Sequence, residues 1–255
     1  MKTDTKPTMI IGLGTGRCGT QSLSRFLSNQ PGMVVLHEGT IGGYDHPFRW
    51  EDDHERVRSW IEGLPELLGH PACCGDVGMY FLPYCEFLIE IHPGIRFVCI
   101  ERDRDEVVES FVHHTPGRHP WTHHDGSRWR IDPVWDLTYP KFDEPDKRKA
   151  AGLYWDLYHA EITRLVARYP DRVSRYPTDS LNSREGRTAI LDFVGYQGPR
   201  NLDASFRFNA SRGVFRHRMR CGFERLLETG RPLLPASVRH YLWNQFGQHL
   251  HRFLR

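Results

Sequence analysis

The sequence predicts one three-layer α/β domain built on a mainly parallel sheet. Short apolar runs at residues 9–13, 33–36, 72–77 and 95–100 have the length and composition of buried strands. Segments with apolar residues at helical spacing separate these runs, and this alternation is typical of a parallel sheet covered by helices. At 255 residues the chain is long enough for one domain with an ample core.

The first strand leads into a glycine-rich turn at residues 14–19 (GTGRCG), which a helix follows. Glycines let the backbone approach an anion closely, and the N–H groups of a first helical turn favour negative charge. Arg17 adds a permanent cation, and Thr20 and Ser22 add hydroxyl donors. The stretch therefore predicts a site for a phosphate or a sulfate.

An NTPase P-loop is the first of three interpretations of this turn. The glycine spacing has the right shape, but Thr20 and Gln21 stand where that motif needs Lys and Ser or Thr. Ser22 is out of register for the usual magnesium ligand. The chemistry of a P-loop NTPase is therefore missing.

A Rossmann dinucleotide site is the second interpretation. Residues 14–19 fit the GxGxxG spacing, and Glu38 would be the acidic ligand of the ribose. Against this, Arg17 projects within the turn, and the polar residues 20–22 follow the last glycine, where close packing of helix on sheet favours small apolar side chains.

The third interpretation is a resemblance to the sulfotransferase family. In that family a loop of the pattern (K/R)-x-G-T-(T/Q) binds the 5′-phosphosulfate of 3′-phosphoadenylyl sulfate (PAPS). The matching residues here are Arg17-Cys18-Gly19-Thr20-Gln21-Ser22. Arg102 and Ser110 fit the family's pattern R-D-x-x-x-x-x-x-S, whose Arg and Ser bind the 3′-phosphate of PAPS. The resemblance covers residues 8–113 well and 147–196 loosely.

Glu38 is the predicted general base. It follows the second strand, and in open α/β sheets ligands bind at the carboxyl ends of strands. Sulfotransferases with a carboxylate base commonly end this strand in a glutamate, so the resemblance implies the same role here. Arg17 is expected to favour ionised Glu38 and to stabilise charge that develops during transfer. His37 is the alternative base, and strand alternation predicts that it points away from Glu38.

Several segments are less specific. Asp76, near the end of the third strand, is open to three roles: a second carboxylate, an acceptor contact or a cap of the next turn. Residues 113–147, rich in His, Trp, Arg and Pro, are predicted to be a variable insert that shapes the acceptor site. Their histidines lack metal-site spacing, so no metal is expected. Arg212 and Gly213 resemble a family loop that closes over the 3′-phosphate. A helical extension is predicted at about 214–255.

Composition limits the functional class. The net charge of +2 gives no reason to expect nucleic acid as a partner. The N-terminal residues are polar, no later stretch is long enough to span a membrane, and the six cysteines form no CxxC pair. These features predict a cytoplasmic protein without a transmembrane segment.

The resemblance implies the P-loop-NTPase-like fold of sulfotransferases and a matching activity. The expected reaction moves a sulfuryl group from PAPS, with PAP as the product, to a hydroxyl or amine of a small-molecule or glycan acceptor, without a metal. Two alternatives stay open: a Rossmann-type NAD(P)-binding oxidoreductase and a non-catalytic protein that binds PAP or another nucleotide. The sequence is also compatible with a homo-oligomer.

Overall fold

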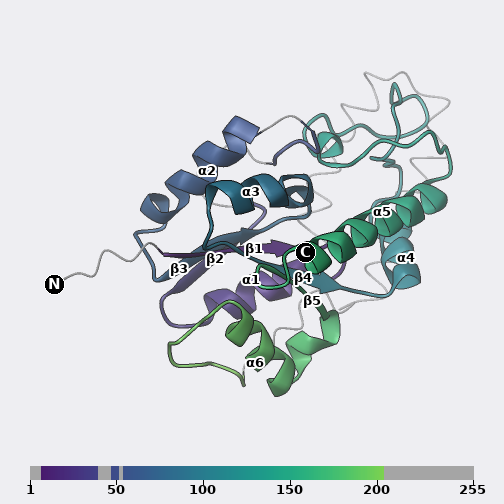
Figure 1. Cartoon of the computed structure of the whole chain (residues 1–255). Coiled ribbons are helices and arrows are strands. Elements are labelled where there is room, and N and C mark those ends of the chain that lie inside the picture. Colours follow the sequence, from purple (N-terminus) through teal and green to yellow (C-terminus); the bar gives the residue numbers. More distant parts are fainter. Residues whose placement is uncertain (1–6, 40–46, 52–53, 204–255) are drawn as a thin grey trace, which may run out of the picture.

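The computed structural model describes residues 7–39, 47–51 and 54–203, and its core is a parallel sheet (Figure 1). Five strands run in the order β2-β3-β1-β4-β5, and every neighbouring pair is parallel. The strands are β1 (Thr8–Leu13), β2 (Met33–His37), β3 (Cys73–Val77), β4 (Arg96–Glu101) and β5 (Val173–Pro177). The predicted α/β fold class is confirmed.

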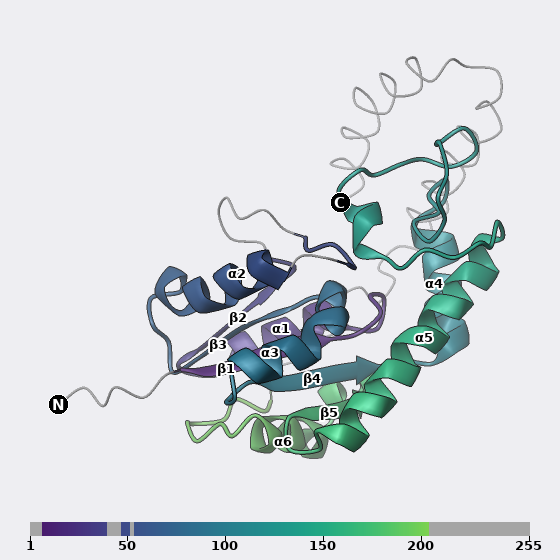
Figure 2. The ribbon, with the colours of Figure 1, turned by 45° about the horizontal axis from the view of Figure 1, so that its top comes forward.

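Helices cover both faces of this sheet, as Figures 1 and 2 show. One face carries α1 (Thr20–Ser28) and α6 (Arg184–Phe193), whose apolar residues share a core with Ile10 of β1. The other core holds Met9 and Ile11 with apolar residues of four helices. These are α2 (His54–Leu67), α3 (Cys85–Ile91), α4 (Arg104–His114) and α5 (Lys147–Arg168). The alternation of β1 side chains between the two cores follows from the pleat of a strand.

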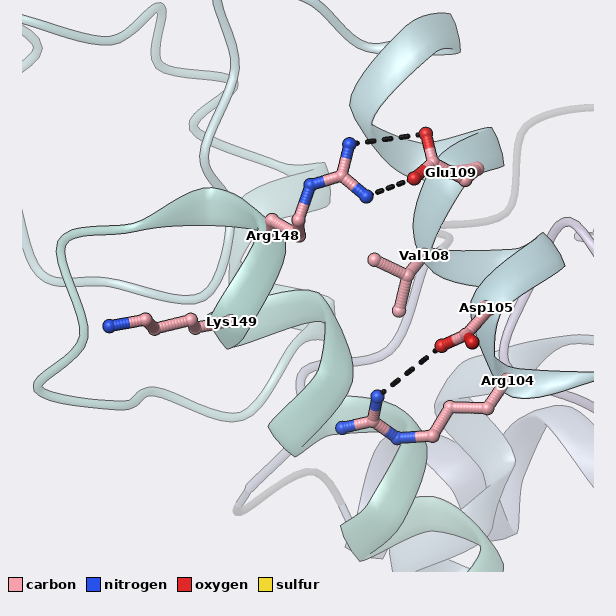
Figure 3. A pocket seen from close by; sticks show the side chains of 6 residues that line it. All are labelled: Arg104, Asp105, Val108, Glu109, Arg148 and Lys149. Carbon is pink, nitrogen blue, oxygen red and sulfur yellow. Dashed lines mark hydrogen bonds and ion pairs between the residues drawn. The ribbon is translucent and has the colours of Figure 1, made fainter.

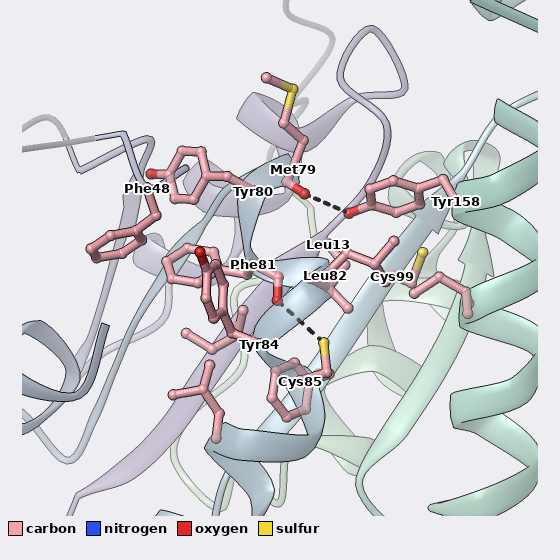
Figure 4. Close-up of a cluster of buried hydrophobic side chains, with 14 of the residues drawn as sticks. Leu13, Phe48, Met79, Tyr80, Phe81, Leu82, Tyr84, Cys85, Cys99 and Tyr158 are labelled. Carbon is pink, nitrogen blue, oxygen red and sulfur yellow. Dashed lines mark hydrogen bonds between the residues drawn. The ribbon is translucent and has the colours of Figure 1, made fainter. Parts of the chain in front are cut away.

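Several aromatic side chains pack together within the second of these cores (Figure 4). Phe48 packs edge-on against Tyr80 and Phe81, with ring centroids 5.6 and 5.7 Å apart. Tyr80 and Phe81 belong to the short 3-10 helix η1 (Met79–Tyr84), which follows β3 directly. Because every residue of this element except Pro83 is buried, it fixes the path of the chain just beyond the carboxyl end of β3.

The predicted insert packs onto the domain. Between α4 and α5 the chain forms the 3-10 helix η2 (Trp135–Thr138) and otherwise follows an irregular path. Trp121 is fully buried, and Arg118 pairs with Asp136 at 2.6 Å, with both side chains at most 15% exposed. Lys141 donates to the carbonyl groups of Pro120 and Asp136. The insert is therefore an ordered segment, held by the buried Trp121 and by contacts among its own residues.

Two further observations concern the described residues alone. None of their helices combines the length and the apolar character needed to cross a bilayer. Nor do they contain a group of three or more His, Cys, Asp or Glu side chains gathered as metal ligands. The predicted extension at about 214–255, Arg212 and Gly213 lie outside the described residues.

Candidate active site

The glycine-rich turn lies at the carboxyl end of β1, directly before α1. Gly16, Arg17 and Gly19 all have positive φ, at 76°, 60° and 100°. Gly19 occupies the N-cap of α1 and makes no side-chain capping bond to the first turn of that helix. The N–H groups at the positive end of a helix form a preferred place for a phosphate or sulfate.

Arg102 and Ser110 lie against this turn, although they are distant in the sequence. Arg17 Nε donates to Ser110 Oγ at 3.1 Å, and Arg102 Nη1 donates to the Arg17 carbonyl at 3.0 Å. Arg102 follows β4, the neighbour of β1 in the sheet, and Ser110 lies on α4. The structure thus brings the residues of the two sequence patterns together: two cations, a hydroxyl and a helix N-terminus.

The other predicted residues of the loop differ in solvent exposure. Cys18 is buried, and burial raises the pKa of its thiol to about 11, so the side chain stays protonated and apolar in character. Thr20 and Ser22 are each 8% exposed, whereas Gln21 is half-buried. Cys18 therefore contributes its backbone to the loop, and its thiol packs behind it.

Two residues that the sequence did not assign to the site hold this loop in place. Thr178 Oγ1 lies 2.7 Å from the Cys18 carbonyl and 3.0 Å from the Glu101 carbonyl. The Tyr158 hydroxyl accepts from Gly14 N at 2.9 Å and donates to the Met79 carbonyl at 3.3 Å. Thr178 directly follows β5. Its place at the carboxyl end of a strand, the same sheet edge as the loop, is the sequence signal that could have identified it.

Glu38 follows β2 at this same edge and has an unusual backbone. Its φ is 54°, and among the described residues only Arg17 and His70 are other non-glycine residues with positive φ. Such a conformation costs an L-residue about 1–2 kcal/mol. Strain of this kind gathers at functional sites, where the surrounding structure holds it. Both predicted catalytic residues, Arg17 and Glu38, carry it.

The charge of Arg17 acts on Glu38. Burial raises the pKa of the Glu38 carboxyl above its usual value, while Arg17 opposes that rise. Arg17 therefore favours the ionised form, as expected, but burial has the larger effect. The result is a carboxylate that binds a proton more strongly than an exposed glutamate does.

The prediction that His37 points away from Glu38 is wrong. His37 Nδ1 lies 3.8 Å from Glu38 Oε2, because the left-handed backbone at Glu38 ends the alternation of the strand. His37 Nε2 also lies 3.2 Å from Thr20 Oγ1. Burial, with the charge of Arg25, lowers the pKa of His37 to about 4, so the ring is neutral at pH 7 and a weaker base than a free imidazole.

Asp76 is fully buried at the end of β3 and turns toward backbone groups. Oδ1 accepts from Val77 N at 2.8 Å, and Oδ2 accepts from Gly39 N at 3.0 Å and from the Tyr80 hydroxyl at 3.2 Å. Burial is the main cause that raises the pKa of Asp76 to about 7, and the negative charge of Glu38 adds to it. Of the three predicted roles, these backbone contacts fit the role of a turn cap best.

A cavity of about 390 Å³ lies between α4 and α5 (Figure 3). Its lining residues are Arg104, Asp105, Val108, Glu109, Arg148 and Lys149. Arg148 pairs with Glu109, and Arg104 lies 3.7 Å from Asp105 and binds Asp156. Because most of these charges are paired and no predicted site residue lines the cavity, it is not part of the candidate active site.

Comparison with known proteins identifies the family of this chain. A family model described as a sulfotransferase domain matches residues 9–202, well over half of the chain. The chain belongs to the sulfotransferase family. The matched range includes the loop, Glu38, Arg102 and Ser110, and it ends before Arg212.

One solved structure similar to this sulfotransferase is a sulfotransferase from Alicyclobacillus acidocaldarius. The two chains are 15% identical with a TM-score of 0.47, and the match covers 89% of this chain and 94% of the other. No curated protein sequence matches the chain.

Proposed function

We propose that this sulfotransferase moves a sulfuryl group from PAPS to a hydroxyl or amine of a small-molecule or glycan acceptor. One observation carries the proposal: Arg17, Arg102 and Ser110 meet at the N-terminus of α1, with Glu38 within electrostatic reach of Arg17. This arrangement suits a donor with two anionic groups beside a carboxylate of raised proton affinity.

The residues present fit a donor with two separate anionic groups. The loop N–H groups, Arg17 and the hydroxyls of Thr20 and Ser22 would hold the phosphosulfate. Arg102 and Ser110 would hold the 3′-phosphate, and the Arg102 side chain is 37% exposed and therefore accessible. PAPS supplies an activated sulfuryl group when it is bound. Arg212 and Gly213 remain proposed contacts of the same phosphate.

In this proposal the protein contributes to the transfer reaction through Glu38 and Arg17. Glu38 accepts the proton of the acceptor hydroxyl or amine, which makes that group a stronger nucleophile. Arg17 stabilises the negative charge that develops on the transferred and departing oxygens. The cations Arg17 and Arg102 supply positive charge that kinases obtain partly from magnesium, so the proposal needs no metal.

The first test is calorimetric titration with PAP, run beside NAD⁺ and ATP. We expect micromolar binding of PAP and its loss in Arg102→Ala. Arg184→Ala is the matched control, because Arg184 is an exposed arginine on α6 that pairs with Asp203. Circular dichroism would verify that both variants fold. Binding of NAD⁺ without PAP would instead support the oxidoreductase alternative.

The second test separates an enzyme from a non-catalytic binding protein. Incubation with PAPS and a panel of phenols, sugars and amines should release PAP with at least one acceptor. Binding of PAP without transfer to any member of a broad panel would favour the non-catalytic alternative. A cytoplasmic location is also proposed, because the described cysteines are free thiols, as a reducing compartment allows.

A further inference from the structure

The backbone turn at Glu38 and Gly39 is held from β3 by two consecutive residues. Glu38 N donates to the Val77 carbonyl at 3.0 Å, which continues the ladder between β2 and β3. Gly39 N donates to Asp76 Oδ2 at 3.0 Å, so the Asp76 side chain holds the N–H of the next residue. The two contacts hold the N–H groups on either side of the Glu38 Cα.

This arrangement accounts for the left-handed backbone of Glu38. Gly39 also has positive φ, at 60°, so two left-handed residues follow one another. The captured N–H of Gly39 fixes where the chain leaves the sheet, and an L-residue otherwise relaxes to an extended or helical conformation. In an extended conformation the Glu38 side chain would take the opposite side of the strand from His37, which it does not.

The Asp76 carboxylate is suited to hold such a turn. It is fully buried, and its three donors approach from β3, η1 and the end of β2. A hydrogen bond that a backbone N–H donates to an ionised carboxylate is stronger than one that it donates to a neutral group. An asparagine cannot reproduce the set, because its NH₂ group would face either Val77 N or Gly39 N.

We infer that Asp76 is a positioning residue that fixes the Glu38–Gly39 turn and so keeps the Glu38 carboxylate directed at the acceptor's proton. The inference rests on the proposed function, because Glu38 is the proposed base. Asp76 does not touch the acceptor and acts through Glu38 alone. Glu38 and Tyr80 are the titratable groups near Asp76, while Arg17 and His37 face Glu38 from the loop and from β2.

The test is a double-mutant cycle on turnover with Asp76→Asn and Glu38→Gln, combined with titration of PAP. Asp76→Asn should lower kcat about tenfold to a hundredfold, because the base is misplaced, and leave the Kd for PAP unchanged. In the Glu38→Gln background, Asp76→Asn should cause little further loss. Tyr80→Phe is the matched control, because it removes one donor to Asp76 and keeps the Gly39 contact.

Equal loss of kcat in both backgrounds, or a loss of PAP affinity that matches the loss of kcat, would overturn the inference. A readout that needs no activity accompanies the cycle: the NMR resonance of the Gly39 amide in the wild-type protein. It should shift with pH in step with the Asp76 carboxyl carbon. A Gly39 amide resonance that did not change over this titration would contradict the proposed role of the Gly39–Asp76 hydrogen bond. This readout holds even if the protein transferred no sulfuryl group or Asp76→Asn failed to fold.

Discussion

Arg17 Nε donates to Ser110 Oγ at 3.1 Å across 93 positions of the sequence. The contact joins the turn after β1 to α4, and it forms because β1 and β4 are neighbours in the sheet, with Leu13 beside Cys99. Arg102, which follows β4, closes the same arrangement by donating to the Arg17 carbonyl. Two separate sequence patterns therefore meet in one cluster of two arginines and a serine hydroxyl.

Ser110→Ala should weaken PAP binding about fivefold, because the variant loses one hydroxyl from the site and the acceptor that orients Arg17. Calorimetry would measure the Kd for PAP. Thr188→Ala is the control, because its hydroxyl bonds only within α6, to the Arg184 carbonyl. Unchanged affinity in Ser110→Ala would remove Ser110 from the proposed donor site.

Glu38→Gln should reduce kcat about 10²- to 10⁴-fold, because the amide cannot accept the acceptor's proton. The Kd for PAP should stay the same, and Glu66→Gln on the exposed surface of α2 should behave as wild type. In the wild-type protein, kcat/KM should fall at low pH as Glu38 is protonated, at a pH above the usual glutamate range because burial raises its pKa. Near-normal turnover in Glu38→Gln would exclude Glu38 as the base.

Glu106→Gln should strengthen PAP binding about two- to fivefold. Glu106 Oε2 lies 2.7 Å from Arg102 Nε, so its charge competes with the 3′-phosphate for the same guanidinium. Both side chains are partly exposed, which keeps the effect small. Glu185→Gln, on α6, controls for the change in net charge, and weaker PAP binding in Glu106→Gln would mean that Glu106 instead orients Arg102 for the phosphate.

Asp76 should make the protein less stable as the pH rises from about 4 to about 7. The folded pKa is about 7 and the usual value is 3.8, so the folded state keeps a proton that the unfolded state has released. This contribution to the free energy of unfolding is largest at low pH, and up to about 4 kcal/mol of it is lost by pH 7. Urea denaturation at several pH values would measure it.

The comparison variant for this measurement is Asp76→Asn, which should lack most of that pH dependence. Asp105→Asn, at an exposed position on α4, should retain it. If Asp76→Asn and the wild-type protein lost stability in parallel between pH 4 and 7, the raised pKa of Asp76 would be wrong.

The sequence was enough to locate β1 to β4, the glycine-rich turn and the pair Arg102 and Ser110. These features depend on local patterns, because buried parallel strands are apolar throughout and a glycine-rich turn before a helix is readable within a few residues. The same patterns carried the family resemblance, which the match over residues 9–202 confirms.

The relation between His37 and Glu38 was not readable in this way. Alternation assumes an extended backbone, and the left-handed φ of Glu38 depends on a bond from Gly39 N to Asp76, which lies on another strand. The support of the loop by Tyr158 and Thr178 likewise depends on contacts with α5 and the end of β5.

The sequence by itself therefore determined the fold class and the family and predicted an anion-binding site, because periodicity and short motifs are local properties. Tertiary structure alone decided that Arg17 meets Ser110, that Glu38 turns toward His37 and that Asp76 is closed off from solvent. The physical reason is that burial and hydrogen bonding between distant strands set backbone conformation and pKa, and neither is encoded within a single segment.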